Sequence, residues 1–80
     1  MPRLAPVRRR RLVAVLRRNG LVECPERAKG SHVWFQHPGD PTRHTTVPDR
    51  EVIPVGLLQV IITQAGKDRK RYLKCLEEAG

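Results

Sequence analysis

Glycine and proline residues divide the chain into short segments, and this division limits the elements that it can form. The strongest breaks are Gly20, Pro25, Gly30, the run Pro38-Gly39-Asp40-Pro41, Pro48, Pro54 and Gly66. Proline ends helices and central strands, while glycine commonly follows the last turn of a helix. Because the whole chain has 80 residues, the short elements between these breaks can enclose one compact core and not two. We expect residues 1–80 to form a single domain in which residues 1–6 are a flexible arm.

The first segment predicts a helix over residues 7–19, because it contains no glycine or proline. Pro6 suits the first turn of a helix, and Gly20 supplies its end. The apolar residues at helical spacing form the stripe that we expect to be buried, Leu12, Val13 and Leu16. The arginines of this helix are then expected to face mostly outward.

Three short β-prone segments follow, and they predict a small antiparallel sheet. The segments are Leu21 to Cys24, His32 to His37 and His44 to Val47. The run Pro38-Gly39-Asp40-Pro41 between the second and third segments is a strong turn, so these two segments form a hairpin. No helical segment separates the strands, which argues against parallel pairing.

The central segment predicts a strand with one buried face and one open face, because side chains alternate along a strand. Val33 and Phe35 share one face. His32, Trp34 and Gln36 share the other. One of these faces is expected to pack in the core and the other to remain outside it.

Two helices are predicted after Pro54. The first ends at Gly66, and its apolar residues recur at helical spacing: Leu58, Ile61, Ile62 and Ala65. Asp68 can cap the second, which runs through Leu76 and buries Tyr72, Leu73 and Leu76. The predicted fold class is therefore α+β: a helix, a three-stranded antiparallel sheet, a second helix and a short C-terminal helix, with the helices gathered on one face of the sheet.

Positive charge is concentrated at the start of the chain. Residues 1–20 contain seven arginines and no acidic residue, so +7 of the net charge of +8 lies in this quarter. The chain has 12 arginines against 4 lysines, and the planar guanidinium group suits phosphate. These features favour a nucleic-acid partner. The alternative is that the arginines form an ordinary solvated face.

Membrane and metal-binding functions are not indicated. No apolar run approaches the roughly 20 residues that cross a bilayer, so we expect a cytoplasmic protein with no membrane contact. Cys24 and Cys75 lack the spacing of a disulfide framework or of a zinc motif, and the three histidines after Cys24 do not complete one. We therefore expect neither a metal nor another cofactor.

The motif Gly30-Ser31-His32 opens the central strand beside the basic residues Arg27 and Lys29. RNA can be cleaved without a metal, since its own 2′-hydroxyl attacks the adjacent phosphorus once a base removes the hydroxyl proton. A neutral histidine can be that base, with Arg27 and Lys29 as candidate phosphate ligands. Trp34 is a candidate for stacking on an unpaired base. The alternatives are a strand-edge histidine bonded to backbone and a tryptophan that only caps the sheet.

A series of motifs occurs in the order and at the separations of a known family. They are Leu16, Gly20-Leu21, Gly30-Ser31-His32, Phe35, His37, Val47-Pro48, Gly56-Leu57-Leu58, Ile61 and Gln64-Ala65-Gly66. With them the chain resembles, from about Leu12 to Leu76, the HicA family of toxins from bacterial and archaeal type II toxin–antitoxin systems. The ordered series is far more specific than Gly-Ser-His alone.

The resemblance implies a fold like a double-stranded-RNA-binding domain and an mRNA interferase activity, the metal-independent cleavage of messenger RNA that inhibits translation. The histidine of the Gly-Ser-His motif is essential in that family, and by position it is His32. A HicB antitoxin normally binds and masks such a toxin. The chain departs from the family pattern at Asp49-Arg50, where many members carry a histidine, and at Leu57, where a small hydroxyl residue is common.

The leading hypothesis is a small ribonuclease toxin with His32 as the general base, Lys29 and Arg27 as phosphate ligands, and Ser31 positioning the loop. Arg43, just before the third β-prone segment, is a further candidate contact to single-stranded mRNA. No residue is assigned as the general acid. The alternatives are a non-catalytic RNA-binding module and a subunit whose arginine cluster only docks onto an acidic antitoxin. The oligomeric state is open between a monomer and a heterocomplex with the antitoxin.

Overall fold

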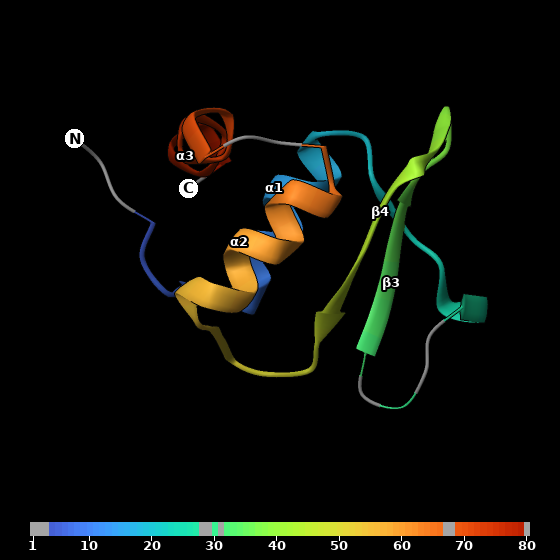
Figure 1. Ribbon diagram of the computed structural model, residues 1–80, viewed down its shortest axis with the longest axis horizontal. Coiled ribbons are helices and arrows are strands. Elements are labelled where there is room, and N and C mark those ends of the chain that lie inside the picture. The colour runs from blue at the N-terminus through green and yellow to red at the C-terminus, as the bar shows by residue number, and fades with distance from the viewer. Residues whose placement is uncertain (1–3, 28–29, 31, 67–68, 80) are drawn as a thin grey trace.

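In the described part of the chain, three α-helices lie on one side of a small antiparallel sheet (Figure 1). The computed structural model describes residues 4–27, 30, 32–66 and 69–79. The elements are β1 (Val7–Arg8), α1 (Arg9–Arg18), β2 (Val22–Glu23), the 3-10 turn η1 (Pro25–Arg27), β3 (His32–His37), β4 (Asp40–Pro48), β5 (Val52–Ile53), α2 (Val55–Gln64) and α3 (Arg69–Ala79). This arrangement confirms the α+β class and is consistent with a double-stranded-RNA-binding-domain-like fold. No helix within these residues is long and apolar enough to span a membrane.

The main sheet has the order β2-β3-β4, and both of its pairings are antiparallel. β3 has the bounds that its sequence predicts. It is the central strand, because Phe35 lies opposite Glu23 on one side and opposite Thr45 on the other. The predicted hairpin of the second and third β-prone segments is therefore confirmed.

β4 is longer than its sequence predicts and begins at Asp40 instead of His44. The hairpin turns within residues 38–39 alone, and a shift in register lets His37 pair with Asp40. The Thr42 hydroxyl donates a hydrogen bond to Asp40 Oδ1 at 2.6 Å. This bond is the main cause that lowers the pKa of the Asp40 carboxyl. The carboxylate of Asp40 thus forms a local hydrogen-bonded motif with Thr42, in a segment where the sequence predicted a longer loop.

The first helix begins two residues later than predicted. Val7 and Arg8 form β1, which pairs antiparallel with β5, Val7 opposite Ile53 and Arg8 opposite Val52. Val7 and Ile53 are both buried. Pro6 therefore precedes a strand and not a helical turn. Local spacing could not reveal this pairing, because the partner strand lies far along the chain.

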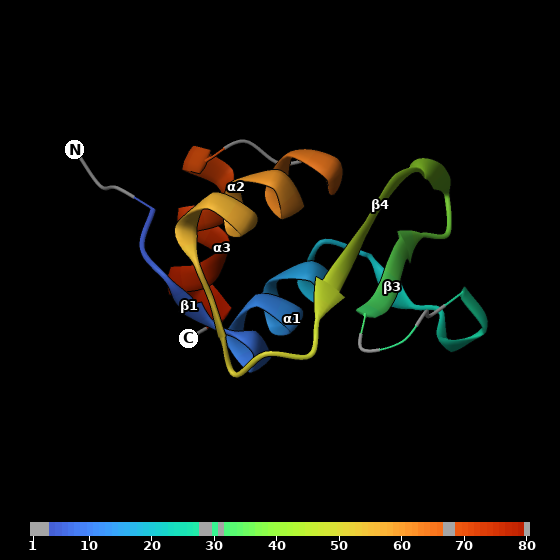
Figure 2. The ribbon, with the colours of Figure 1, turned by 60° about the horizontal axis from the view of Figure 1, so that its bottom comes forward.

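The core lies between the helices and the sheet, and Figure 2 shows the arrangement of these elements from a second direction. α1 buries Leu12, Val15 and Leu16. Val15 is buried where we expected Val13, which is only half-buried. All four residues expected to be buried on the second helix are buried: Leu58, Ile61, Ile62 and Ala65. Phe35 and Val47 complete this core from the sheet.

α3 packs against α1 and extends to Ala79, beyond the expected end at Leu76. Tyr72 is 1% exposed, as predicted, and its burial raises the pKa of its hydroxyl. Within the described residues that hydroxyl has no hydrogen-bond partner. Leu73 and Leu76 are half-buried. The expected helix cap, Asp68, lies outside the described residues.

Gly20, which follows α1, is expected to resist substitution, because its φ angle of +87° lies in the left-handed region. A Cβ atom there would also stand 3.0 Å from His37 Nε2. Gly20→Ala should therefore lower the free energy of unfolding, measured by urea titration, by about 1–2 kcal/mol.

Gly56→Ala is the matched control for that measurement. A Cβ atom at Gly56 meets nothing within 4 Å, and within a helix alanine is favoured over glycine. This change should raise the free energy of unfolding by about 0.5 kcal/mol. Equal losses of stability in the two variants would contradict the explanation given for Gly20.

Candidate nucleic-acid interface

One face of the main sheet is left uncovered by the α-helices (Figures 1 and 2). Phe35, at the centre of β3, is fully buried on the helical side. Because side chains alternate, His32, Trp34 and Gln36 lie on the opposite face. His32 is exposed, and the other two are half-buried. The predicted division of β3 into a core face and an open face is confirmed.

His32 is the first residue of β3, and its side chain is exposed. It pairs with Pro48, the last residue of β4, and so lies at the end of the hairpin away from the turn. Among the residues that the structure describes, none forms a hydrogen bond with the imidazole. No described residue therefore occupies either ring nitrogen, and both can bind an external group. Lys29 and Ser31, the predicted neighbours of His32, lie outside the described residues.

The arginine-rich start of α1 reaches the same end of the sheet. Arg9 Nε donates a hydrogen bond to the carbonyl oxygen of Pro48 at 3.2 Å, and Pro48 is the residue paired with His32. A hollow of about 480 Å³ here is lined by Arg8, Arg9, Arg10 and Glu51. The sequence indicated the charge of this run but not its position, because that position depends on the pairing of β1 with β5.

Trp34 is held by three neighbours on the open face. The guanidinium carbon of Arg27 lies 5.6 Å from the centre of the indole ring, a cation–π contact. The His44 ring stacks on the indole, with centroids 4.7 Å apart and planes 8° from parallel. The indole Nε1 donates a hydrogen bond to Gln36 Oε1 at 3.0 Å. The structure thus brings two predicted site residues, Arg27 and Trp34, together.

His44 is a member of this group that sequence reasoning missed, because it assigned the residue only to the hairpin. Its place on the open face follows from the register, in which His44 lies opposite Gln36. His44 Nδ1 lies 3.0 Å from the carbonyl oxygen of Pro41. Since a carbonyl oxygen only accepts, Nδ1 carries the proton of this hydrogen bond. The pairing register of the hairpin is the signal that could have placed His44 on the open face.

Arg43 lies on the other face of the sheet, away from Trp34. Its Nε donates a hydrogen bond to the carbonyl oxygen of Ala65, just after α2, at 3.1 Å, and its side chain is half-buried. A Cβ atom at Gly66 would stand 2.8 Å from Arg43 Nε, so the glycine leaves room for the guanidinium group. Arg43 therefore fastens β4 to α2, and the structure does not bring it to the face that carries His32.

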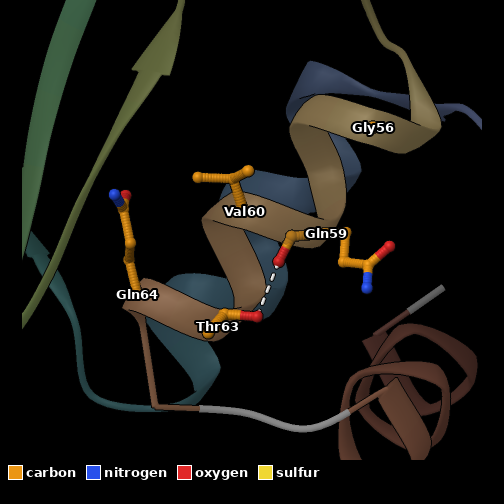
Figure 3. A pocket seen from close by; sticks show the side chains of 5 residues that line it. All are labelled: Gly56, Gln59, Val60, Thr63 and Gln64. Carbon is orange, nitrogen blue, oxygen red and sulfur yellow. Dashed lines mark hydrogen bonds between the residues drawn. The ribbon is translucent and has the colours of Figure 1, made fainter.

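A second hollow, of about 390 Å³, lies along the exposed side of α2 (Figure 3). Its lining consists of Gly56, Gln59, Val60, Thr63 and Gln64. The Thr63 hydroxyl donates to the carbonyl oxygen of Gln59 at 2.8 Å. None of these five side chains titrates, so the hollow offers no group for acid–base chemistry.

The open face carries imidazole groups that can transfer protons, a guanidinium group that can bind anions, and an aromatic stack. In the described ranges, no cluster of three or more His, Cys, Asp or Glu side chains is placed to hold a metal ion. Cys24 and Cys75 are half-buried free thiols. The Cys75 thiol donates to Asn19 Oδ1 at 3.6 Å, which ties α3 to the end of α1.

Replacing Arg43 and Arg27 by methionine should have opposite consequences. Arg43→Met removes a charged donor from the Ala65 carbonyl, and the free energy of unfolding should fall by about 1.5 kcal/mol with little change in RNA affinity. Arg27→Met removes an exposed contact worth about 0.5–1 kcal/mol, but it should weaken binding of single-stranded RNA. Urea titration and RNA-binding measurements on both variants provide the comparison. RNA binding that depends on Arg43 and not on Arg27 would contradict these assignments.

A family model identifies the proteins that the chain resembles. No curated protein matches the chain. A family model described as the HicA toxin of bacterial toxin–antitoxin systems matches residues 9–67. The match runs from the start of α1 through α2 and includes every strand of the main sheet, while α3 lies beyond it. It covers well over half of the chain, and the chain therefore belongs to the HicA toxin family of bacterial toxin–antitoxin systems.

Proposed function

We propose that the chain is a metal-independent endoribonuclease, an mRNA interferase that inhibits translation, and that His32 is its general base. The observation that supports this proposal best is the position of His32, exposed on the uncovered face of the sheet at the end that Arg9 approaches. A general base must reach the proton that it removes, and this imidazole is open to an external group. Membership of the HicA toxin family supports the toxin role.

In the proposed reaction, the neutral imidazole of His32 removes the proton of a ribose 2′-hydroxyl, and the 2′-oxygen attacks the adjacent phosphorus. The bond from phosphorus to the 5′-oxygen breaks, and that oxygen takes a proton from water, to which the open face gives access. The imidazolium then releases its proton to solvent. The products are a 2′,3′-cyclic phosphate and a 5′-hydroxyl end. DNA has no 2′-hydroxyl and should not be cut.

Positive charge at the His32 end of the sheet supports this chemistry. The phosphorane that forms during attack is more negative than the starting phosphodiester, and guanidinium groups stabilise it through charge-assisted hydrogen bonds. Arg9 lies at this end through its hydrogen bond to Pro48, and Arg10 lines the hollow beside it. These two arginines are the proposed contacts to the phosphates nearest the cleaved bond.

Further contacts come from the loop before β3. Arg27 lies over Trp34 on the open face and is the proposed ligand of a neighbouring phosphate. Lys29 is proposed as a second phosphate ligand and Ser31 as the residue that positions the loop, because both lie within three residues before His32 in the chain. Arg43 is left out of this set, since its guanidinium group binds the Ala65 carbonyl on the opposite face.

A toxin of this family implies an antitoxin partner. We propose that the partner is a HicB-type antitoxin and that it prevents RNA from reaching the toxin in the cytoplasm. The net charge of +8 favours a partner with an acidic surface, and charge complementarity would speed its association. The same charge that attracts RNA would then also recruit the inhibitor.

Purified protein, freed from any co-expressed partner, should cleave a long unstructured RNA in excess EDTA. His32→Ala should lower the cleavage rate by about 100- to 10,000-fold, the range that general acid–base catalysis contributes. RNA affinity should change little, since the imidazole is a small part of the binding surface. Gel analysis of RNA fragments, with identification of 2′,3′-cyclic phosphate ends, measures this result.

Two controls separate the competing functions. DNA of the same sequence should remain intact, and Gln59→Ala, on the exposed side of α2, should cut RNA at the unchanged rate. Equal cleavage by His32→Ala would contradict the assigned base. RNA that binds the unaltered protein without being cut would instead indicate a non-catalytic RNA-binding module. Absence of both binding and cleavage would leave partner binding as the function.

A further inference from the structure

We infer that Trp34, Gln36 and His44 form a binding site for one unpaired nucleobase, near the nucleotide that is cleaved. We call these three residues the base subsite. The inference rests on the proposed RNA cleavage at His32, and it adds a recognition element that selects where the RNA strand is held. All three residues come from the open face of the hairpin formed by β3 and β4.

The aromatic pair of the base subsite is a nearly parallel stack, an arrangement that aromatic rings prefer. The ring centroids of Trp34 and His44 lie 4.7 Å apart, and the ring planes are within 8° of parallel. Proteins that read single-stranded RNA stack unpaired bases on aromatic side chains that stand on the face of a sheet. Because none of the described α-helices covers this face, a base can add to the existing stack without displacing part of the core (Figure 2).

The hydrogen bonds that Gln36 and His44 form leave a donor group on one residue and an acceptor on the other. The indole N–H only donates, so it takes the oxygen of the Gln36 amide and leaves the NH₂ group of that amide. His44 Nδ1 donates to the Pro41 carbonyl, which leaves Nε2 as an acceptor when the ring is neutral. Gln36 and His44 are paired residues on adjacent strands. The edge of a nucleobase, which presents donors and acceptors side by side, matches this pair.

The register sets the distance between the base subsite and the proposed base. His44 is paired with Gln36, which lies four residues beyond His32 on β3. At about 3.4 Å per residue this is about 14 Å along the strand. The His44 ring is also held by its stack on Trp34 and its hydrogen bond to Pro41, and we therefore assign it to a nucleotide other than the one that is cleaved. It is well placed to contact a nearby nucleotide of an extended RNA strand that follows β3.

Arg27 supplies positive charge along the path of such an RNA strand. Its guanidinium carbon lies 5.6 Å from the indole centre, and its side chain is exposed. At this distance it can approach a phosphate while remaining beside Trp34. The face of β3 and β4 thus presents, in order along the strand, an imidazole for cleavage, an arginine with an aromatic ring, and the donor and acceptor pair.

Trp34 is the single tryptophan of the chain, so its fluorescence reports directly on the base subsite. The full chain carrying His32→Ala, which should leave RNA uncut, is titrated with a short single-stranded RNA. A second series of oligonucleotides lacks the base at one position at a time. Binding should change the Trp34 emission, and removal of one particular base should lower affinity about tenfold, as expected for the loss of a stacked base.

Substitutions then test whether the residues of the base subsite bind the RNA. His44→Ala and Gln36→Ala should each weaken RNA binding about fivefold to tenfold. The matched controls Gln59→Ala and Val60→Ala, on the exposed side of α2, should leave RNA affinity unchanged (Figure 3). In the chain that retains His32, His44→Ala should still cut RNA but with a changed distribution of cut sites.

The outcome for this subsite is distinguishable from the outcome for the nuclease itself. Unchanged Trp34 emission at saturating RNA, together with equal affinity for every oligonucleotide that lacks a base, would overturn the base subsite while leaving cleavage at His32 standing. A shift of Trp34 emission by RNA that the unaltered protein never cuts would overturn the nuclease and leave base binding standing. Because the fluorescence titration needs no change at the subsite, misfolding of His44→Ala would not hide the result.

Discussion

Burial of Phe35 decides which face of the central strand is free for chemistry. Phe35 is fully buried between the sheet and the helices, and truncation of such a side chain typically costs about 3–5 kcal/mol. Strand side chains alternate, so with Phe35 inside, His32 and Trp34 must face outward. A slip of one residue in the register would bury both of them and expose Phe35. The packing energy of the core thus holds the proposed base on the open face.

The position of the N-terminal arginines depends on a different constraint, the pairing of β1 with β5. α1 has no acidic residue in its first turn and no side-chain cap. Arginines occupy this turn instead, although the helix dipole disfavours positive charge there. The Arg9 N–H donates to the carbonyl oxygen of Glu51 at 2.9 Å, and Arg8 forms an ion pair with the Glu51 carboxylate at 2.8 Å. These contacts hold the basic end of α1 at the sheet. A surface with this charge at the end that carries His32 is suited to the phosphates of RNA.

Much of the fold could be predicted from the sequence, because local spacing determines it. The bounds of β3 and its two faces followed from alternation, and the buried side of α2 followed from its helical period. The pairing of Val7 with Ile53 could not be read in this way, since neither segment shows which distant strand it joins. For the same reason, the stack of His44 on Trp34 and the contact of Arg43 with α2 needed the register of the hairpin and the packing of the helices. Residue types indicated the chemistry, but their grouping on one face depended on tertiary structure.

The sharpest test of 2′-hydroxyl attack at His32 is an RNA in which one nucleotide is replaced by its 2′-deoxy form. The replaced nucleotide is the one whose 2′-hydroxyl lies at a mapped cut site. The proposed mechanism predicts that cleavage at this position stops, while other cut sites in the same molecule are cleaved at unchanged rates. Cleavage at the altered position at the original rate would show that the 2′-hydroxyl is not the nucleophile. His32 would then not act as the base that activates it.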